Sequence, residues 1–486
     1  MDTLNKTIKK LSEAEYQALL QEVSGKKKNK PYLVLETTRK NDVDDSTMME
    51  LLQVNPSTYY TLKSRLNTKI AAILSKKVNN PIKVLMDEVA RVPANLFGTN
   101  KEFSIRALKD LEKQLIEYDL SSELIVVYKT LAELHLFSEE HDHYEQLYNK
   151  NVAFSLAIGK AEQQYHRFIK TMGVYKLTLD NELLEELKTI MKQMQNICEL
   201  YDSHRLFVYF NIIRIYYLCN VAENKEGLKS RELEIEKILQ EMTQIFDKYN
   251  LDTTYQNIKS LTDFLFFEYY QKTNNQIRAD FYLDRITPVI ADISGRHIMS
   301  FHVSQFLQSK ILKYLNDSNA DQLSSHNDTL EKHYDVDSQE FYHFVTYEKF
   351  KAISKFYKGD FSGSAKIVND LRNSISLKHY LHADVDAKLF QSLQYCIMGE
   401  DGLCLQIISS LKRQIKAQEN EFSSVKVFVK LLKAALKPAD YRKKIKKINE
   451  LWAEFQDANN EAKFPVLNYL KLDEGLIRKI TNPIKE

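Results

Sequence analysis

The chain has 486 residues, of which only 11 are Gly and 8 are Pro, well below the average usage of roughly 7% and 5%. This scarcity excludes a turn-rich β architecture and favours helices. With 68 basic and 66 acidic side chains the formal net charge is +2, so the chain as a whole has no field that would drive non-specific binding to nucleic acid.

The first 23 residues spread their apolar side chains along a charged amphipathic pattern, which predicts one helix and no cleavable signal sequence. No segment reaches the roughly 18 consecutive apolar residues of a membrane span. The nearest, residues 206–219, is interrupted by Asn211 and Arg214 and predicts a buried helix. The four cysteines lie in apolar helical patterns without a CxxC pair: Cys198, Cys219, Cys396 and Cys404. They indicate free buried thiols in a reducing compartment, so we expect a cytoplasmic protein.

Residues 24–30 form a basic linker, and residues 31–40 predict a helix, with a short strand as the alternative. Residues 1–80 together hold 14 basic and 9 acidic side chains. This modest surplus fits a phosphate contact and fits a soluble terminal arm equally well. The Asn80-Pro81 step is expected to end this terminal module.

Within the module, residues 45–74 predict a short helix, a tight turn and a longer second helix. Ser46 or Thr47 is expected to cap the first helix, and Asn55 followed by Pro56 is a signal for the start of the second. The second helix has one apolar stripe at spacings of three and four: Tyr59, Leu62, Leu66, Ile70 and Ile73. Its opposite face is polar and carries Thr58, Thr61, Ser64, Arg65 and Lys69.

The segments ELLQVNPST (50–58) and KSRL (63–66) resemble the helix-turn-helix of sigma-factor region 4 and related regulators. In that family the second helix enters the major groove of DNA. The resemblance implies that the DNA-facing residues are Ser57, Thr58, Tyr60, Thr61, Ser64 and Arg65. The adjacent Tyr59 and Tyr60 are bulky where a base-reading helix usually has small or hydrogen-bonding side chains, which favours a protein as the partner. Ordinary packing of two helices is the structural alternative.

A further helix is expected from Ile82 to Ala90, ending at Pro93, and from Lys101 onward the pattern predicts a series of amphipathic helices of ordinary length. Near the C-terminus these helices repeat, because Gly359-Asp360 and Gly399-Glu400 lie forty residues apart and apolar positions match at the same offset. Around the first copy, Ala352, Tyr357, Gly359-Asp360-Phe361 and Ala365 resemble a tetratricopeptide repeat. The resemblance implies an α-solenoid over residues 100–460 whose concave face binds a partner. An ordinary helical bundle is the alternative.

Two aromatic clusters are expected to be core rather than groove-lining, because aromatic side chains supply the buried area that a thin array needs. They comprise Phe207, Tyr209, Phe210, Tyr216 and Tyr217, and then Phe264, Phe266, Phe267, Tyr269 and Tyr270. Residues 316–338 are the longest polar interruption and predict an insertion or a linker.

Little in the sequence indicates catalysis. The only dense cluster of His and carboxylates spans residues 135–143, and it lacks a recognised metal spacing, so a surface turn is expected. The chain has no GxxxxGK[ST], GxGxxG or GxSxG motif. We expect no enzyme activity and no cofactor. The basic run 441–447 would contact nucleic acid or an acidic partner, or keep the end of the array soluble.

The sequence therefore predicts an all-α chain with a helix-turn-helix module at 1–80, a first solenoid part at 81–315, the polar segment 316–338, and a second part with capping helices at 339–486. Overall it resembles uncharacterised cytoplasmic helical proteins of Bacteroidetes-type bacteria. We expect an interaction scaffold that binds a protein or peptide in the solenoid groove. The alternative is a transcription-linked regulator, similar to peptide-sensing regulators that join a helix-turn-helix to tetratricopeptide repeats. In it, residues 45–74 contact DNA or the transcription machinery.

Overall fold

The computed structural model describes residues 3–11, 13–23, 29–41, 43–76, 81–95, 100–222, 225–250, 252–290, 300–317, 336–416, 421–437, 441–462 and 465–482, with residues 323, 325, 328 and 330. Every regular element in these ranges is a helix, which confirms the all-α class. None of the helices described is long and apolar enough to cross a membrane. The chain divides into two compact units, the first made of residues 1–155, 243–259 and 289–296, and the second of residues 156–242, 260–288 and 297–486.

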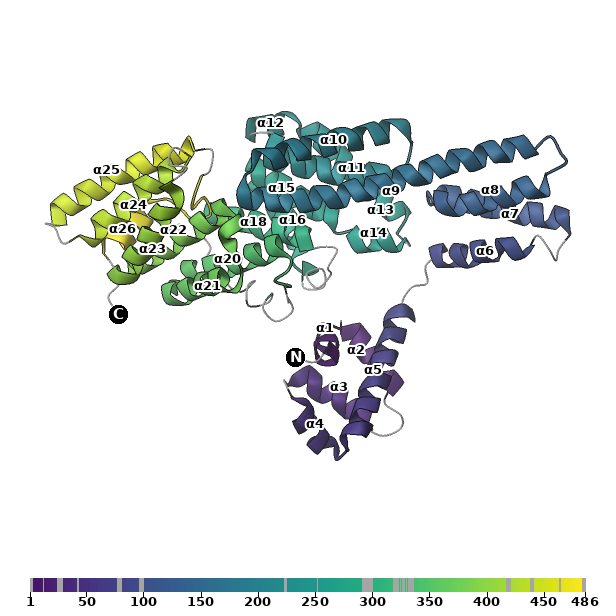
Figure 1. Ribbon diagram of the computed structural model, residues 1–486, viewed down its shortest axis with the longest axis horizontal. Coiled ribbons are helices and arrows are strands. Elements are labelled where there is room, and N and C mark those ends of the chain that lie inside the picture. Colours follow the sequence, from purple (N-terminus) through teal and green to yellow (C-terminus); the bar gives the residue numbers. More distant parts are fainter. Residues whose placement is uncertain are drawn as a thin grey trace. The chain divides into compact units, whose positions relative to one another are not determined.

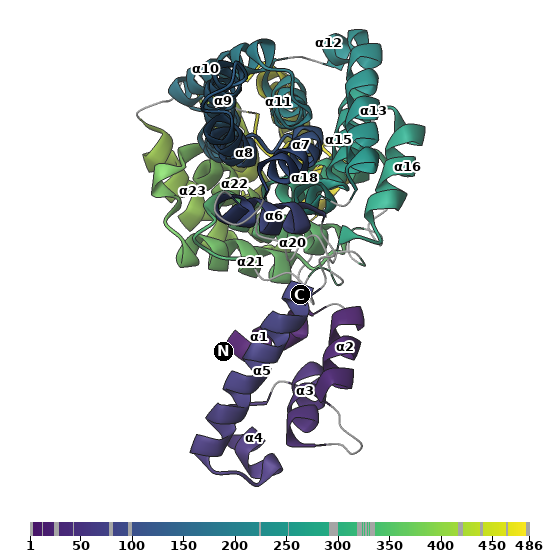
Figure 2. The same cartoon turned by 90° about the vertical axis from the view of Figure 1, so that its right-hand side faces the viewer.

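The first unit begins with five helices that pack around a hydrophobic cluster of their own, whose buried members run from Leu4 to Ile70. Figure 2 shows α3, α4 and α5 of this bundle. The helices are α1 (Thr3–Lys10), α2 (Glu13–Val23), α3 (Lys30–Lys40), α4 (Asp45–Leu52) and α5 (Pro56–Lys76). The helix predicted over residues 31–40 is confirmed as α3, and Asn29 caps it by accepting the Tyr32 N–H at 3.0 Å.

The single helix expected over residues 1–23 is wrong, because α1 ends at Lys10 and α2 begins at Glu13. The sequence offers a reason, since Ser12 and Glu15 have the S-x-x-E spacing that favours a new helix start. A second difference is at Pro93, which lies inside a helix that continues to Asn95. A proline so close to the end of a helix removes only one hydrogen bond from its last turns.

The rest of the first unit is built on a helical hairpin and the helices beside it. These are α6 (Pro81–Asn95), α7 (Lys101–Glu117), α8 (Ser121–Leu134), the start of α9 (His141–Thr178) and α14 (Thr253–Ile258). Apolar side chains of α6, α7 and α8 form one buried cluster, and the hairpin turns at Asp119, whose φ is 52°. At 38 residues α9 is much longer than the helices expected from the sequence.

The second unit begins with the remainder of α9. It continues with α10 (Asn181–Leu200), α11 (His204–Tyr217), the π-helical turn η1 (Leu218–Ala222), α12 (Lys225–Ser230), α13 (Glu232–Lys248), α15 (Leu261–Thr273), α16 (Gln276–Ile286) and α18 (Ser300–Asp317). The last residues of α13, 243–248, belong to the first unit. The aromatic side chains of α15 are buried, as predicted, whereas only Tyr216 of the first aromatic cluster is fully buried. The imidazole of His302 lies in this core between two tyrosines, 2.8 Å from the Tyr165 hydroxyl and 2.7 Å from that of Tyr216.

The C-terminal helices of this unit follow one another as antiparallel neighbours (Figure 1). They are α20 (Phe341–Tyr357), α21 (Phe361–Ser374), the 3₁₀ turn η3 (Leu377–His379), α22 (Leu381–Met398), α23 (Asp401–Ile415), α24 (Ser423–Leu436), α25 (Tyr441–Asn460) and α26 (Glu474–Thr481). The four cysteines are free, and three of them are buried, with Cys198 half-buried. Most of the polar segment predicted at 316–338 lies outside the residues described.

The forty-residue repeat in the sequence corresponds to two helical hairpins, α20–α21 and α22–α23. The chain reverses in both hairpins at a glycine in the left-handed backbone conformation, Gly359 with φ 86° and Gly399 with φ 75°. Residues with a Cβ atom rarely adopt this conformation. The residue after each glycine donates its N–H to a carbonyl of the preceding helix, at 3.0 Å and 2.9 Å.

The two hairpins also share a contact between their helices. In the first, the Ser364 hydroxyl donates to the carbonyl of Ala352 at 2.5 Å. In the second, the thiol of Cys404 lies 3.3 Å from the carbonyl of Ser392. Ser364 and Cys404 are forty residues apart, as are Ala352 and Ser392, so the two hairpins make equivalent contacts at equivalent positions.

Candidate functional site

The turn between α4 and α5 is built from backbone and side-chain caps. Gln53 adopts the left-handed conformation with φ 51°, and Val54 donates its N–H to the carbonyl of Met49 at 3.2 Å. Asn55 then starts α5, because its side chain accepts the Thr58 N–H at 2.8 Å. The first helix is capped by Asp44, which accepts the Thr47 N–H at 2.8 Å, so the cap expected at Ser46 or Thr47 is wrong by two or three residues.

A partly buried ion pair fixes α4 against α5. The Lys63 ammonium donates to both carboxylate oxygens of Asp45, at 3.0 Å and 3.1 Å, and the Tyr59 hydroxyl donates to the same carboxylate at 3.0 Å. Only 10% of the Lys63 side chain is exposed, and burial lowers its pKa. The charge of Lys63 is therefore compensated inside the module and does not belong to its contact surface.

The residues predicted to contact DNA or a partner gather on the outer face of α5. Those that the structure places in solvent are Ser57, Thr58, Tyr60, Thr61, Ser64 and Arg65. Tyr60 is 54% exposed, whereas Tyr59 is buried at 2%. Lys69 is half-buried and lies at the edge of this surface. The 21 residues of α5 include no Asp or Glu, so the exposed face combines hydroxyl groups, one tyrosine and positive charge.

A second candidate site, which the sequence analysis missed, is a cavity of about 370 Å³ within the second unit. Residues of its wall come from the end of α9, from α18, α20, α21 and α22, and from the segment 465–469. The apolar side chains of the wall include Leu177, Ile311, Leu312, Val345, Ile353, Leu371, Ala387 and Phe390.

The ammonium of Lys176, which lines the cavity, is held by amide groups. It donates to the side-chain oxygens of Asn220 at 2.8 Å and Gln308 at 3.2 Å, and also to Gln305. Asn220 in turn donates to the buried carboxylate of Glu268 at 2.7 Å. Burial lowers the pKa of Lys176 to about 7, and the carboxylate of Glu268 opposes this shift.

The wall of the cavity also contains the buried carboxylate of Asp386. Burial alone would raise its pKa, but the Lys349 ammonium, His382 and the Leu467 N–H together hold the pKa below its ordinary value. The Leu467 N–H donates to this carboxylate at 2.9 Å, and Lys349 forms an ion pair with it. The ammonium of Lys349 also lies 3.7 Å from the centre of the Tyr469 ring. The wall of the cavity therefore combines apolar side chains with two charged groups that are bonded within the protein, a lining that is typical of ligand-binding pockets.

The cluster at residues 135–143 forms a surface turn, with one feature of metal sites. The Nδ1 atom of His141 lies 3.0 Å from the Ala132 carbonyl, and its Nε2 lies 3.6 Å from Glu145. Possible ligand atoms of His141, Asp142 and Glu145 lie within 4.8 Å of one another. Both carboxylates are exposed, while His135 pairs instead with Glu140 at 2.6 Å.

One signal in the sequence points toward the cavity: charged residues that lie within strongly apolar helices. Lys349 and Asp386 both occur in such stretches, of which FVTYEKF (344–350) and VDAKLF (385–390) are the local sequences. A charge in such a pattern usually has a buried partner. The sequence does not identify which partner, because the two residues belong to different helices.

No protein-family model matches the chain, and comparisons with curated proteins and with solved structures give no match. Its function is therefore argued from the two sites above.

Proposed function

We propose that the chain is a non-enzymatic adaptor that binds a protein or peptide segment in the cavity of the second unit and docks through the α5 face. The observation that carries this proposal is the cavity, whose wall combines apolar side chains with the bonded charges of Lys176 and Asp386. Such a wall accepts apolar side chains of a peptide and hydrogen-bonds its polar backbone. Lys176 and Asp386 in this wall are already hydrogen-bonded or paired within the protein, which favours binding over chemistry.

The paired hairpins support an array as the scaffold for this cavity. Equivalent turns and equivalent side-chain hydrogen bonds recur in α20–α21 and α22–α23. A repeated hairpin that packs on its neighbour is the unit of a tetratricopeptide-like α-solenoid, and such arrays bind partners on their inner surface. The proposed array extends over residues 100–460, and its location is the cytoplasm, which the four free cysteines support.

The α5 face is the proposed second docking surface. Tyr and Arg are enriched at protein interfaces, and Tyr60 and Arg65 are both exposed on a helix that the Asp45–Lys63 pair holds in place. Rigid support of this kind reduces the entropy lost on binding.

The proposal is tested by affinity capture from cell lysate with the full-length chain and with Ala387→Phe, which fills the cavity from α22. Lysates are treated with nuclease in parallel. We expect protein partners that resist nuclease and are lost with Ala387→Phe but retained with Ala434→Phe on α24, a control outside the cavity lining. Partners that bind both variants equally would contradict a role for the cavity, provided that both variants keep the helical content of the parent.

A second candidate function is supported by the composition of α5. This helix has no acidic residue, and its outer face carries Arg65 with Lys69 at half-burial. We infer as the alternative a transcription-linked regulator, whose exposed hydroxyl groups and Arg65 contact DNA or the transcription machinery. Binding of duplex DNA that weakens steeply with salt and is reduced by Arg65→Ala would support it, and unchanged binding with Arg65→Ala would remove it.

A further inference from the structure

The positive charge of the chain is concentrated near its C-terminus. Residues 401–450 hold 12 Lys and Arg against 5 Asp and Glu, a local net charge of +7, whereas the whole chain has +2. The remaining 436 residues therefore carry a net charge of −5. Such segregation is not needed for solubility, because mixed charges serve that purpose equally well.

The structure places these cations on three helices, α23, α24 and α25, of which α24 packs against both others. The exposed members are Lys412, Arg413, Lys416, Lys430, Lys437, Arg442, Lys443, Lys446 and Lys447. We call this set the basic surface.

Cations of the basic surface lie beside other cations. Burial, and then the neighbouring ammonium groups of Lys412 and Lys437, lower the pKa of Lys433. Lys412 comes from α23 and Lys433 from α24, so the folding of the chain brings like charges together across two helices. This arrangement costs free energy in the unbound protein, and an anion placed among the three lysines would recover it.

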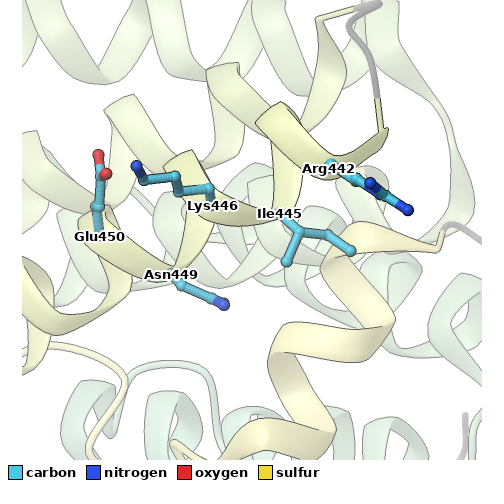
Figure 3. Close-up of a pocket in the computed structure, with 5 residues that line it drawn as sticks. All are labelled: Arg442, Ile445, Lys446, Asn449 and Glu450. Carbon is cyan, nitrogen blue, oxygen red and sulfur yellow. The ribbon is translucent and has the colours of Figure 1, made fainter.

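Positive charges also lie close together at the start of α25. Its first turn has no acidic residue and contains Arg442, Lys443 and Lys444, although the N-terminus of a helix has partial positive charge. Figure 3 shows Arg442 and Lys446, one helical turn apart, on the rim of an open hollow of about 580 Å³ that Ile445, Asn449 and Glu450 also line. The one carboxylate there, Glu450, is paired with Lys447 at 3.2 Å.

We propose that the basic surface of α23, α24 and α25 binds the phosphate backbone of a nucleic acid without reading its bases. Duplex nucleic acid presents about one negative charge per 1.7 Å of its axis, a density that matches cations spread over several helices. Among the described residues of these three helices, the exposed large apolar side chains are Leu403 and Leu405 of α23, and none lies on α24 or α25. Two leucines are a smaller apolar face than that with which basic helices insert into a bilayer. Among the described residues of these helices, no aromatic side chain is exposed, which argues against stacking on bases.

The test uses the full-length chain and a fluorescent duplex of about 20 base pairs, with anisotropy measured at about 50 mM and about 200 mM salt. The basic-surface variant combines Lys412→Gln, Lys437→Gln, Arg442→Gln and Lys446→Gln. A control variant with the same loss of charge combines Lys129→Gln, Lys192→Gln, Lys237→Gln and Lys366→Gln, all at exposed positions on other helices. We expect the parent to bind with an affinity that falls steeply with salt, at least a tenfold loss in the basic-surface variant, and a shallower salt dependence in that variant.

Two outcomes would overturn the proposal. An equal loss in both variants would show that net charge alone drives binding, and absence of duplex binding by the parent at low salt would remove the proposal outright. Vesicles with phosphatidylserine and a polyglutamate peptide serve as further probes, and preference for either over the duplex would assign the surface to a membrane or to an acidic protein. Arg65→Ala separates this site from α5, because the basic surface predicts that duplex binding survives that substitution.

Discussion

At the scale of single residues, the Asp45–Lys63 ion pair makes a prediction about the N-terminal bundle. In Asp45→Ala, the ammonium of Lys63 stays buried without its carboxylate, and the Tyr59 hydroxyl loses the same acceptor. We expect local destabilisation of α4 and α5 by about 1–2 kcal/mol, less than for a fully buried pair because Asp45 is partly exposed. Hydrogen–deuterium exchange resolved to individual peptides measures this change.

A double variant and a surface pair serve as controls for that prediction. Asp45→Ala combined with Lys63→Met removes the unpaired charge, so exchange protection should be partly restored. Glu36→Ala breaks the pair with Lys40, whose side chain is 67% exposed, and should leave protection nearly unchanged because water screens an exposed pair. If Asp45→Ala alone leaves protection unchanged, the ion pair does not fix α4 against α5.

Lys176 gives the second unit a stability that depends on pH. Its pKa is about 7 in the folded protein and about 10.5 in an unfolded chain, so between these values the unfolded chain binds more protons. The free energy of unfolding contributed by this residue must therefore rise as the pH rises above 7. Burial also lowers the pKa of Lys310 to about 7, which adds a contribution of the same sign.

The measurement is a series of urea unfolding curves between pH 7 and pH 9 for the parent and for Lys176→Met. We expect the midpoint of the parent to increase with pH more steeply than that of the variant, and the slope to fall again when Lys310→Met is added. A slope that Lys176→Met leaves unchanged would mean that this ammonium is not buried as described.

At the scale of elements, two glycines of α9 make a matched pair. A Cβ atom added at Gly173 would lie 3.1 Å from the Cβ of Tyr342, whereas nothing lies within 4 Å of one added at Gly159. Tyr342 cannot easily move, because it is buried in the amide network that also holds Lys176. Gly159→Ala should therefore stabilise α9 by about 0.5–1 kcal/mol, and Gly173→Ala should destabilise its packing on α20 by about 1–3 kcal/mol. Urea midpoints and local hydrogen exchange measure the change in stability of each variant. Equal changes in the two variants would contradict the close contact between Gly173 and Tyr342.

The elements also show where sequence reasoning succeeds. The two helices predicted within residues 45–74 are confirmed as α4 and α5. Local signals determine them, namely the helix start at Asn55-Pro56 and an apolar stripe at helical spacing. The forty-residue repeat was visible because both copies keep the same glycine turn. The break after Lys10 was not predicted, because a uniform amphipathic pattern obscured the start signal at Ser12.

At the scale of the whole molecule, the cavity could not be read from the sequence. Its wall combines Lys176 of α9, Tyr342 of α20, Asp386 of α22 and Tyr469 near the C-terminus, and only folding brings these segments together. The basic run at residues 441–447 was visible, but its extension to Lys412 and Lys433 depends on how α23 and α24 pack. Features formed by neighbouring residues can be predicted from the sequence. Sites formed by residues from distant helices cannot, because they depend on how those helices pack.

The hydrophobic cluster of the first five helices predicts that they fold without the rest of the chain. Its buried members, from Leu4 to Ile70, come from α1 to α5, except Leu11, which lies between α1 and α2. We expect a fragment of residues 1–80 to be helical and to unfold cooperatively on heating, although a core of this size gives only marginal stability. Leu66→Ala, at a position only 1% exposed, should cost about 2–5 kcal/mol and abolish the transition, whereas Leu51→Ala, at a position 52% exposed, should preserve it. Circular dichroism during heating distinguishes these outcomes, and a fragment that melts without cooperativity would show that the cluster needs residues beyond position 80.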